Sequence, residues 1–276
     1  FQDNSFVDEV FQNALWQNYY IGLDGGTRKV RYTASMGYTD DAGVAVGTNF
    51  SRFSARSNAD VQISDRLKFT AGFDFGQTLT NAYASQHQVI SRGLYCPPTQ
   101  KIRNADGTPT PGYNASSPSP LYYAYLNDND QKINKLGING GLEWEIIDGL
   151  KANATASLYT STATGDYFTR ANKFNGTRPS SSDLTDQQRK KLEAYLSYTR
   201  TFGNHSLSVM AGYSYQDYKY KYLKASAADA ISDKIPTLNA GPTKTEATTT
   251  MEEQVLIGYF GRVNYDYKKK YLLTLT

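Results

Sequence analysis

The residues best suited to contact a ligand are four tyrosines in a long, turn-rich part of this 276-residue chain. They are Tyr113, Tyr122, Tyr123 and Tyr125, and the segment around them is rich in Pro, Gly, Ser and Asn, as surface loops are. Flat phenol rings stack on sugar faces, and their hydroxyls form hydrogen bonds at a wet surface. Capture of a glycan or peptide is therefore one interpretation. Packing of the loop against itself or against a partner protein is the other.

Two glutamates are spaced as a carboxylate pair. Glu143 and Glu145 lie two positions apart, so on a strand they point the same way, about 7 Å from each other. Paired carboxylates carry out glycoside hydrolysis, which makes this geometry worth testing. The same face of the strand includes Lys135 and Asn139, and a water-facing polar surface explains all four residues without catalysis. We therefore expect no enzyme.

Other signs of catalysis or metal binding are missing or incomplete in the sequence. There is no G-x-S-x-G, no phosphate-binding glycine loop and no H-E-x-x-H. The run NDNDQ at 127–131 offers oxygen ligands but lacks the spaced Gly and final Glu of an EF-hand. His205 is expected in a tight turn and His87 in a long loop. The sequence predicts no catalytic residue, no metal site and no cofactor.

The composition excludes several classes of protein. The mean hydropathy is -0.58, and no run of about 18 apolar residues could form a membrane-spanning helix. A membrane β-barrel is not excluded, because its strands are apolar on one face only. The net charge is +3 with dispersed basic residues, so nucleic acid is not an expected partner. The single Cys96 permits neither an internal disulfide nor a thiolate metal cluster.

The elements that position these residues are predicted to be strands, because apolar residues recur at every second position. From Leu67 to Phe75, apolar side chains alternate with Lys, Thr, Gly and Asp. The same period recurs at residues 17–24, 30–39, 52–61, 135–146, 150–158, 191–202, 205–217 and 257–275. We predict about ten strands, most of them about 10 to 13 residues long.

The connections between these strands alternate between short turns and long links. Short turns are predicted at 25–29, 64–66, 147–149, 203–205 and 268–270, and long links at about 40–50, 77–133, 160–189 and 218–252. A Greek-key sandwich has no reason to keep every long connection at one end, whereas a membrane barrel with extracellular loops does. The predicted fold class is all-β, an antiparallel up-and-down transmembrane β-barrel.

In such a barrel the two faces of each strand meet different surroundings. The predicted lipid-facing residues are Phe69, Phe73, Leu136, Ile138, Leu142 and Val263. The predicted lumen-facing residues are Arg31, Arg52, Arg56, Asp60, Asp74, Glu143, Glu145 and Arg262. Selectivity of the lumen is one role for the arginines, and ion pairing with Asp60 and Asp74 across strands is another; the family resemblance described next adds contact with a plug domain.

Two stretches resemble the SusC/RagA family of TonB-dependent outer-membrane transporters of Bacteroidota. They are GYFGRVNYDYKKKYLLTLT at 258–276 and LDGGTRKVRYTASMGYTDDAGV at 23–44. Weaker similarity is found at 6–14, 144–158 and 192–216, and the order of all five stretches is that of the family. The resemblance runs, with gaps, along the whole chain.

The resemblance implies part of a 22-stranded barrel in a Gram-negative, Bacteroidota-like outer membrane, which imports oligomeric nutrients, most often glycans. It also implies a SusD-like surface lipoprotein, the TonB complex, outer-membrane lipid, and an oligosaccharide or peptide substrate as partners. Compared with the family pattern, residues 1–276 are expected to be a partial barrel that lacks the plug domain, the TonB-contacting segment and the later strands. The alternatives are a peptide importer of the same family and a surface adhesin or carbohydrate-binding β-protein that transports nothing.

Overall fold

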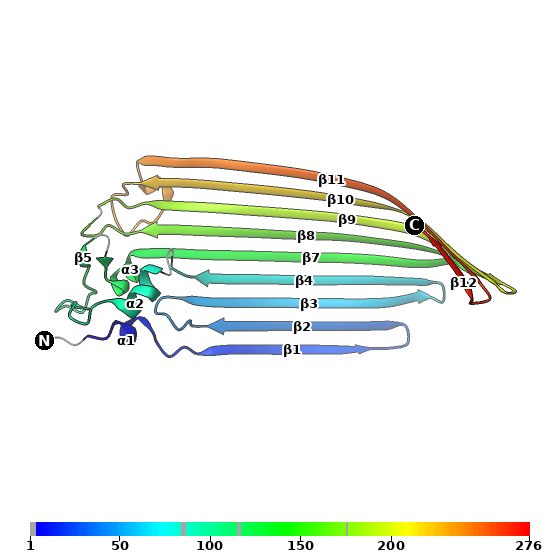
Figure 1. Ribbon diagram of the computed structural model, residues 1–276, viewed down its shortest axis with the longest axis horizontal. Coiled ribbons are helices and arrows are strands. Elements are labelled where there is room, and N and C mark those ends of the chain that lie inside the picture. The colour runs from blue at the N-terminus through cyan, green and yellow to red at the C-terminus, as the bar shows by residue number, and fades with distance from the viewer. Residues whose placement is uncertain (1–3, 84–86, 115–116, 175) are drawn as a thin grey trace.

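One antiparallel sheet of ten strands dominates the computed structural model, which describes residues 4–83, 87–114, 117–174 and 176–276 (Figure 1). The strands lie side by side in chain order, so the up-and-down arrangement and the predicted strand number are confirmed. They are β1 (Trp16–Gly26), β2 (Val30–Asp41), β3 (Asn49–Ser64), β4 (Leu67–Asn81), β7 (Asn127–Ile147), β8 (Leu150–Thr169), β9 (Ser180–Phe202), β10 (His205–Ala228), β11 (Thr243–Tyr267) and β12 (Tyr271–Leu275).

Short turns and long links lie at opposite ends of this sheet (Figure 1). We call these the turn end and the link end. The four links occupy residues 42–48, 82–126, 170–179 and 229–242. Residues 84–86, 115–116 and 175 of the predicted links lie outside the described residues.

The predicted strand lengths and link bounds are wrong for the second half of the sheet. Strands β7 to β11 have 21, 20, 23, 24 and 25 residues, so most of the predicted links 160–189 and 218–252 is strand. The added segments, such as 180–189 and 243–254, are mostly polar on both faces, with Leu184 and Met251 as isolated large apolar residues. Apolar alternation therefore stops while the backbone ladder continues, since hydrogen bonding between strands does not require an apolar side.

At the link end lies a small packed unit that we call the cap. It consists of α1 (Phe6–Val10), η1 (His87–Ser91), α2 (Arg92–Tyr95), α3 (Pro120–Leu126) and the link 42–48. Nearby are the short hairpin of β5 (Gly112–Asn114) and β6 (Ser117–Pro118) and the turn η2 (Leu238–Ala240). In the described ranges, no helix is long and apolar enough to cross a membrane.

Local sequence explains the cap helices. Ser5 caps α1 by accepting the amide hydrogen of Asp8, and Phe6 and Val10, four residues apart, are buried on one side of the helix. Pro120 opens α3, where its missing amide hydrogen costs no hydrogen bond. Val10 packs in a buried cluster with Ala45, Tyr83 and Val89, and Phe6 packs in a second with Ile102 and Leu121.

The turn between β11 and β12 has an unusual backbone. Lys268 and Lys269 have φ angles of 56° and 55°, in the left-handed region that β-hairpin turns of this kind require. Glycine and asparagine adopt this region readily, whereas a lysine side chain is strained there. The turn between β9 and β10 uses Gly203, with φ of 61°, for the same purpose.

Candidate functional site

The pairing register divides the predicted site residues between the two faces of the sheet. Residues directly opposite in an antiparallel ladder project to the same face. Arg56 pairs with Asp74 on one face, while the adjacent Phe73 pairs with Ile138 on the other. When this pairing is traced from strand to strand, all predicted lumen-facing residues project to one face of the sheet, which we call the polar face. They are Arg31, Arg52, Arg56, Asp60, Asp74, Glu143, Glu145 and Arg262. The opposite, apolar face carries Phe69, Phe73, Leu136, Ile138, Leu142 and Val263. Which surroundings each face meets is not decided by this register and stays a prediction.

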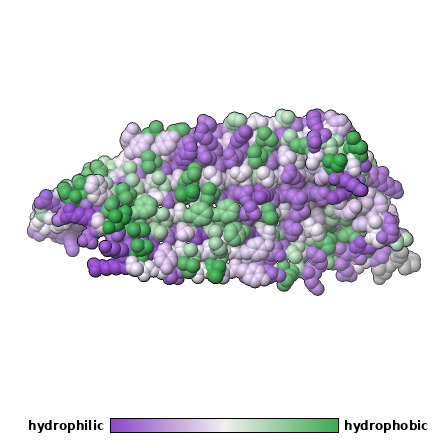
Figure 2. Space-filling view, turned by 180° about the vertical axis from the view of Figure 1, so that it is seen from behind, coloured by the Kyte–Doolittle hydropathy of each residue, from purple (hydrophilic) through white to green (hydrophobic). Residues whose placement is uncertain are grey.

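The apolar face is largely uncovered by the described chain. Ile21, Ile257 and Tyr259 are 70%, 58% and 83% exposed, and Met36 and Leu196 are exposed as well. Figure 2 shows apolar side chains gathered most densely over the half of the sheet nearer the turn end. An apolar surface of this extent requires apolar surroundings.

The polar face carries ion pairs rather than a catalytic arrangement. Lys151 Nζ lies 2.8 Å from Glu143 Oε1, and Lys68 Nζ lies 3.6 Å from Asp60 Oδ2. All four side chains are partly exposed, so each pair contributes at most about 1 kcal/mol to stability. Glu143 is thus engaged by a lysine, and Glu145 pairs across the ladder with the same Lys151.

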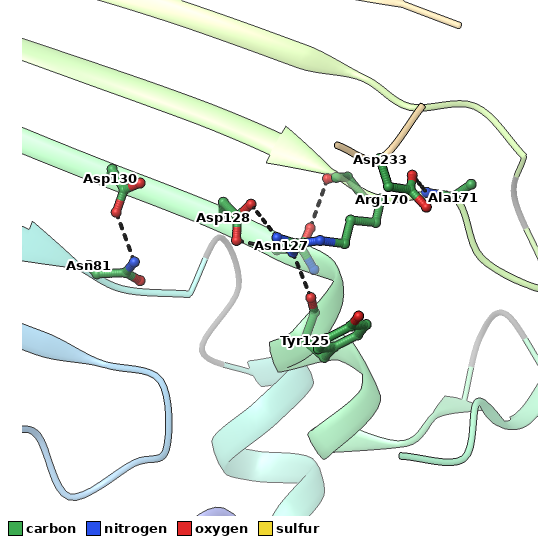
Figure 3. Close-up of polar contacts among 9 residues, drawn as sticks. Asn81, Tyr125, Asn127, Asp128, Asp130, Arg170, Ala171 and Asp233 are labelled. Carbon is green, nitrogen blue, oxygen red and sulfur yellow. Dashed lines mark hydrogen bonds and ion pairs between the residues drawn. The ribbon is translucent and has the colours of Figure 1, made fainter. Parts of the chain in front are cut away.

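At the link end, Arg170 ties the start of β7 to the link after β8 (Figure 3). Its guanidinium donates to both carboxylate oxygens of Asp128, at 3.0 and 2.7 Å, and to the carbonyl oxygen of Tyr125 at 2.8 Å. The same guanidinium lies 5.4 Å from the centre of the Tyr125 ring. A bidentate pair of this kind fixes both partners in orientation.

The run NDNDQ at 127–131 is the first part of β7 and not a loop. Asp128 is paired with Arg170, and Asp130 accepts a hydrogen bond of 2.8 Å from the Asn81 side chain (Figure 3). Over the described parts of the chain, no group of three or more His, Cys, Asp or Glu side chains is arranged to hold a metal ion.

The four candidate tyrosines do not form one group. Tyr113 and Tyr125 are each 61% exposed, on β5 and α3. Tyr123 packs against the cluster around Val10 in the cap, and this burial raises its pKa. Tyr122, beside it on α3, is half-buried. Tyr113 and Tyr125 are therefore accessible from solvent and their ligand role stays a prediction, whereas Tyr123 has the packing role that the sequence left open.

The links contact one another at their bases. Asp233 accepts the amide hydrogen of Ala171 at 2.9 Å and the Nε hydrogen of Arg178 at 2.6 Å, so these donors lower the pKa of its carboxyl. Arg178 also donates to the carbonyl of Ala230 at 3.2 Å. In the cap, Tyr83 donates to the Val46 carbonyl, and burial raises its pKa to about 12.

A cavity of about 550 Å³ lies at the link end and is lined in part by Asp128 and Asp130 of β7. Its walls come from four separate segments: 128–130 on β7, 166–168 on β8, 180–182 on β9, and 236–239 in the last link. This volume is in the range of small-ligand pockets. The sequence gives no signal for the cavity, because no single segment shows a binding pattern and only the strand register brings the four together.

The two histidines lie apart. His205 begins β10 next to the turn, with Nδ1 2.6 Å from the Tyr265 hydroxyl and its ring stacked on Phe202. His87 lies in η1, with Nε2 3.3 Å from the Tyr95 hydroxyl.

Comparisons with known proteins agree with this geometry. No family model matches the chain. The chain is 27% identical to the TonB-dependent receptor P3 of Formosa agariphila, over 99% of its own length and 29% of that protein. It is 24% identical to the TonB-dependent receptor SusC of Bacteroides thetaiotaomicron, over 99% of its length and 30% of that protein.

Among solved structures, the RagAB peptide transporter superposes with a TM-score of 0.82 at 21% identity, over 97% of this chain and 32% of that one. The chain thus spans less than a third of the curated relatives P3 and SusC. These relatives are receptors and not enzymes, in line with the sequence prediction. The chain is part of an outer-membrane β-barrel that is similar, along nearly all of its 276 residues, to TonB-dependent receptors of the SusC and RagA type.

Proposed function

We propose that these strands form part of the wall of an outer-membrane importer of oligomeric nutrients, chiefly glycans. The observation that carries the proposal is the division of the sheet into an exposed apolar face and a charged polar face. In a barrel of this family the apolar face meets lipid and the polar face lines the passage. The six apolar and eight charged residues predicted for these roles agree with that assignment.

The choice of glycan over peptide rests on the chemistry of the exposed tyrosines. Tyr113 and Tyr125 present most of their surface at the link end, and aromatic rings suit the stacking of sugar faces. Peptide import is the second candidate, because the RagAB peptide transporter superposes over nearly the whole chain. In both versions the passage selects cargo, and no residue performs chemistry on it.

The proposed partners follow from the family. A SusD-like lipoprotein would close over the link end, where the cap and the exposed Tyr113 and Tyr125 lie. Energy would come from the TonB complex. The four links, at 42–48, 82–126, 170–179 and 229–242, would then be extracellular.

Uptake by living cells tests this proposal. We expect deletion of the complete gene to abolish uptake of fluorescently labelled oligosaccharides of one composition, and the intact gene to restore it. Labelled peptides of similar size serve as the control cargo. Loss of peptide uptake alone would support the second candidate, and unchanged uptake of both would indicate an adhesin or binding protein.

Extraction tests the assignment of the two faces independently of cargo. The complete protein should remain in the membrane pellet in buffer and enter solution only with detergent. If it came into buffer as a monomer, the lipid-facing assignment of Phe69, Phe73, Leu136 and Ile138 would be wrong.

A further inference from the structure

A row of aromatic and basic side chains crosses three strands on the polar face. Tyr159 of β8 pairs with Arg189 of β9, which pairs with Tyr218 of β10, so the three side chains are neighbours on one face. Lys191 is the next residue of β9 on that face, and Tyr220 the next of β10. We call these five residues the platform. The Arg189 guanidinium lies 5.3 Å from the centre of the Tyr218 ring.

The platform lies on the same face as the charged residues described above. Tyr159 also pairs with Gly137 of β7, and Gly137 pairs with Asp74 of β4. Asp74 in turn pairs with Arg56. The platform therefore faces the passage under the proposed function, and not the lipid.

The side chains on the opposite face show how far along the strands the platform lies. There, the continuous apolar pairing on β9 and β10 runs outward as far as Leu192 with Tyr215, and a single apolar pair, Leu184 with Leu223, recurs further out beyond polar pairs. The pairs directly outward of Leu192 are Lys190 with Asp217 and Gln188 with Lys219, which are polar. The platform is thus level with the outer limit of the continuous apolar band, at the mouth of the passage.

The two cations of the platform are available to a ligand. Arg189 and Lys191 are both exposed, and neither belongs to an ion pair among the described residues. The nearest carboxylates to Arg189 on this face, Glu193 and Glu252, are more than about 11 Å away along and across the sheet, whereas Glu193 lies about 7 Å from Lys191 along β9 without forming an ion pair with it. Two like charges about 7 Å apart on one strand repel each other, and an anion between them would remove that cost.

We propose that the platform binds an acidic oligosaccharide, with tyrosine rings under the sugar faces and Arg189 and Lys191 paired with its carboxylate or sulfate groups. A guanidinium forks onto planar or tetrahedral oxyanions, and an ammonium adds a second point charge. The half-buried rings of Tyr218 and Tyr220 lie about 7 Å apart along β10, and Tyr159 lies about 10 Å from Tyr218 across β9, so the three supply flat surfaces on which sugars stack. The inference rests on the proposed import of glycans and narrows it to an anionic class.

Binding to the complete protein, purified in detergent with its lipoprotein partner, tests the platform. The calorimetric probes are a tetrasaccharide of galacturonic acid, a sulfated galactose tetrasaccharide and a neutral galactose tetrasaccharide. We expect at least one anionic probe to bind about ten-fold or more tightly than the neutral one, and that preference to weaken as salt rises. The two anionic arms distinguish carboxylate from sulfate recognition.

A matched set of variants locates the effect. Arg189→Gln with Lys191→Gln should abolish the preference for the anionic probe, whereas Lys190→Gln, between them but on the opposite face, should preserve it. Tyr218→Ala should lower the affinity for every probe, whereas Tyr218→Phe, which keeps the aromatic ring, should leave the affinities unchanged. Equal affinity of the unmodified protein for anionic and neutral probes would overturn the inference, as would an unchanged preference in the double variant.

A different result would contradict the proposed function, namely that cells carrying the intact gene import no oligosaccharide of any kind. Import of neutral glycans without any preference for acidic ones would leave the proposed function standing and remove only the platform. All substituted side chains in the glutamine variants are exposed, so folding should be retained.

Discussion

The cap and the sheet differ in where their apolar side chains lie. The cap has a core such as soluble proteins have, with Val10 and Val89 fully buried, while the large apolar side chains of the sheet stay exposed. Apart from Phe168 and Ala227, at the link ends of β8 and β10, the buried apolar side chains of the described residues belong to the cap and the links. One chain thus combines a unit that folds by excluding water with a sheet whose exposed apolar face, under the proposed function, meets lipid.

The largest expected effect is in the cap. Leu121→Ala removes a buried side chain from the cluster with Phe6 and Ile102, and should destabilise the cap by about 2 to 5 kcal/mol. Hydrogen exchange of the α3 amides measures this cost. It should be the same in detergent and in bilayers, because lipid does not enter the cluster. Leu94→Ala, at an exposed position of α2, is the control and should change little.

The sheet should respond to charge according to face. Phe73→Arg should lower the free energy of unfolding of the complete protein in phospholipid bilayers by about 2 to 4 kcal/mol, since it places a cation in lipid. Asp74→Arg, the next residue, faces Arg56 on the polar face and should cost about 1 kcal/mol at most. Equal costs, measured by urea titration in vesicles, would mean that lipid does not distinguish the two faces.

High pH should affect the cap before the sheet. Burial raises the pKa of Tyr83 to about 12, above the ordinary value of 10.0, so the folded cap favours the protonated phenol. The stability of the cap is therefore complete below pH 10 and falls as pH rises from about 10 to 12, by about 1.4 kcal/mol per unit. Limited proteolysis of the cap across this range measures the loss. Tyr83→Phe, which cannot ionise, should remove most of the pH dependence.

The smallest expected effect is the relief of backbone strain at the turn end. This strain is local to the turn and depends on neither lipid nor a buried core. Lys268→Asn combined with Lys269→Gly should stabilise the hairpin of β11 and β12 by about 1 kcal/mol, because both new residues tolerate positive φ. Thermal unfolding of the double variant compared with the parent protein checks this. Lys270→Gly, outside the two strained positions, should not stabilise.

The sequence predicts which residues project to each face of the sheet better than it predicts the lengths of the strands. Between Leu67 and Phe75 apolar and polar residues alternate strictly, so periodicity identifies both the strand and its two faces. In 180–189 Leu184 is the single large apolar residue, so there is no apolar alternation to separate strand from loop. The cap was also missed, because α1, α2 and α3 have five, four and seven residues and are stabilised by contacts with one another.

The candidate site was predictable only in part. Tyr113 and Tyr125 could be singled out as exposed aromatics, but nothing in the sequence told them apart from the packed Tyr123. The platform was missed although Tyr218 and Tyr220 alternate along β10, because Arg189 and Tyr159 become their neighbours only through the register of three strands. Sites that are built across a ladder depend on pairing, which a single sequence does not reveal.

The unbroken register of β9 and β10 limits how this protein can change in evolution. The two strands pair from Phe202 and His205 to Ser180 and Ala227 without a shift. One residue inserted into either strand would turn every side chain beyond it to the other face. Hairpins of this kind can therefore grow or shrink only by even numbers of residues in each strand, and the mouth of the passage can gain or lose whole binding rows while its lining and its outer surface stay distinct.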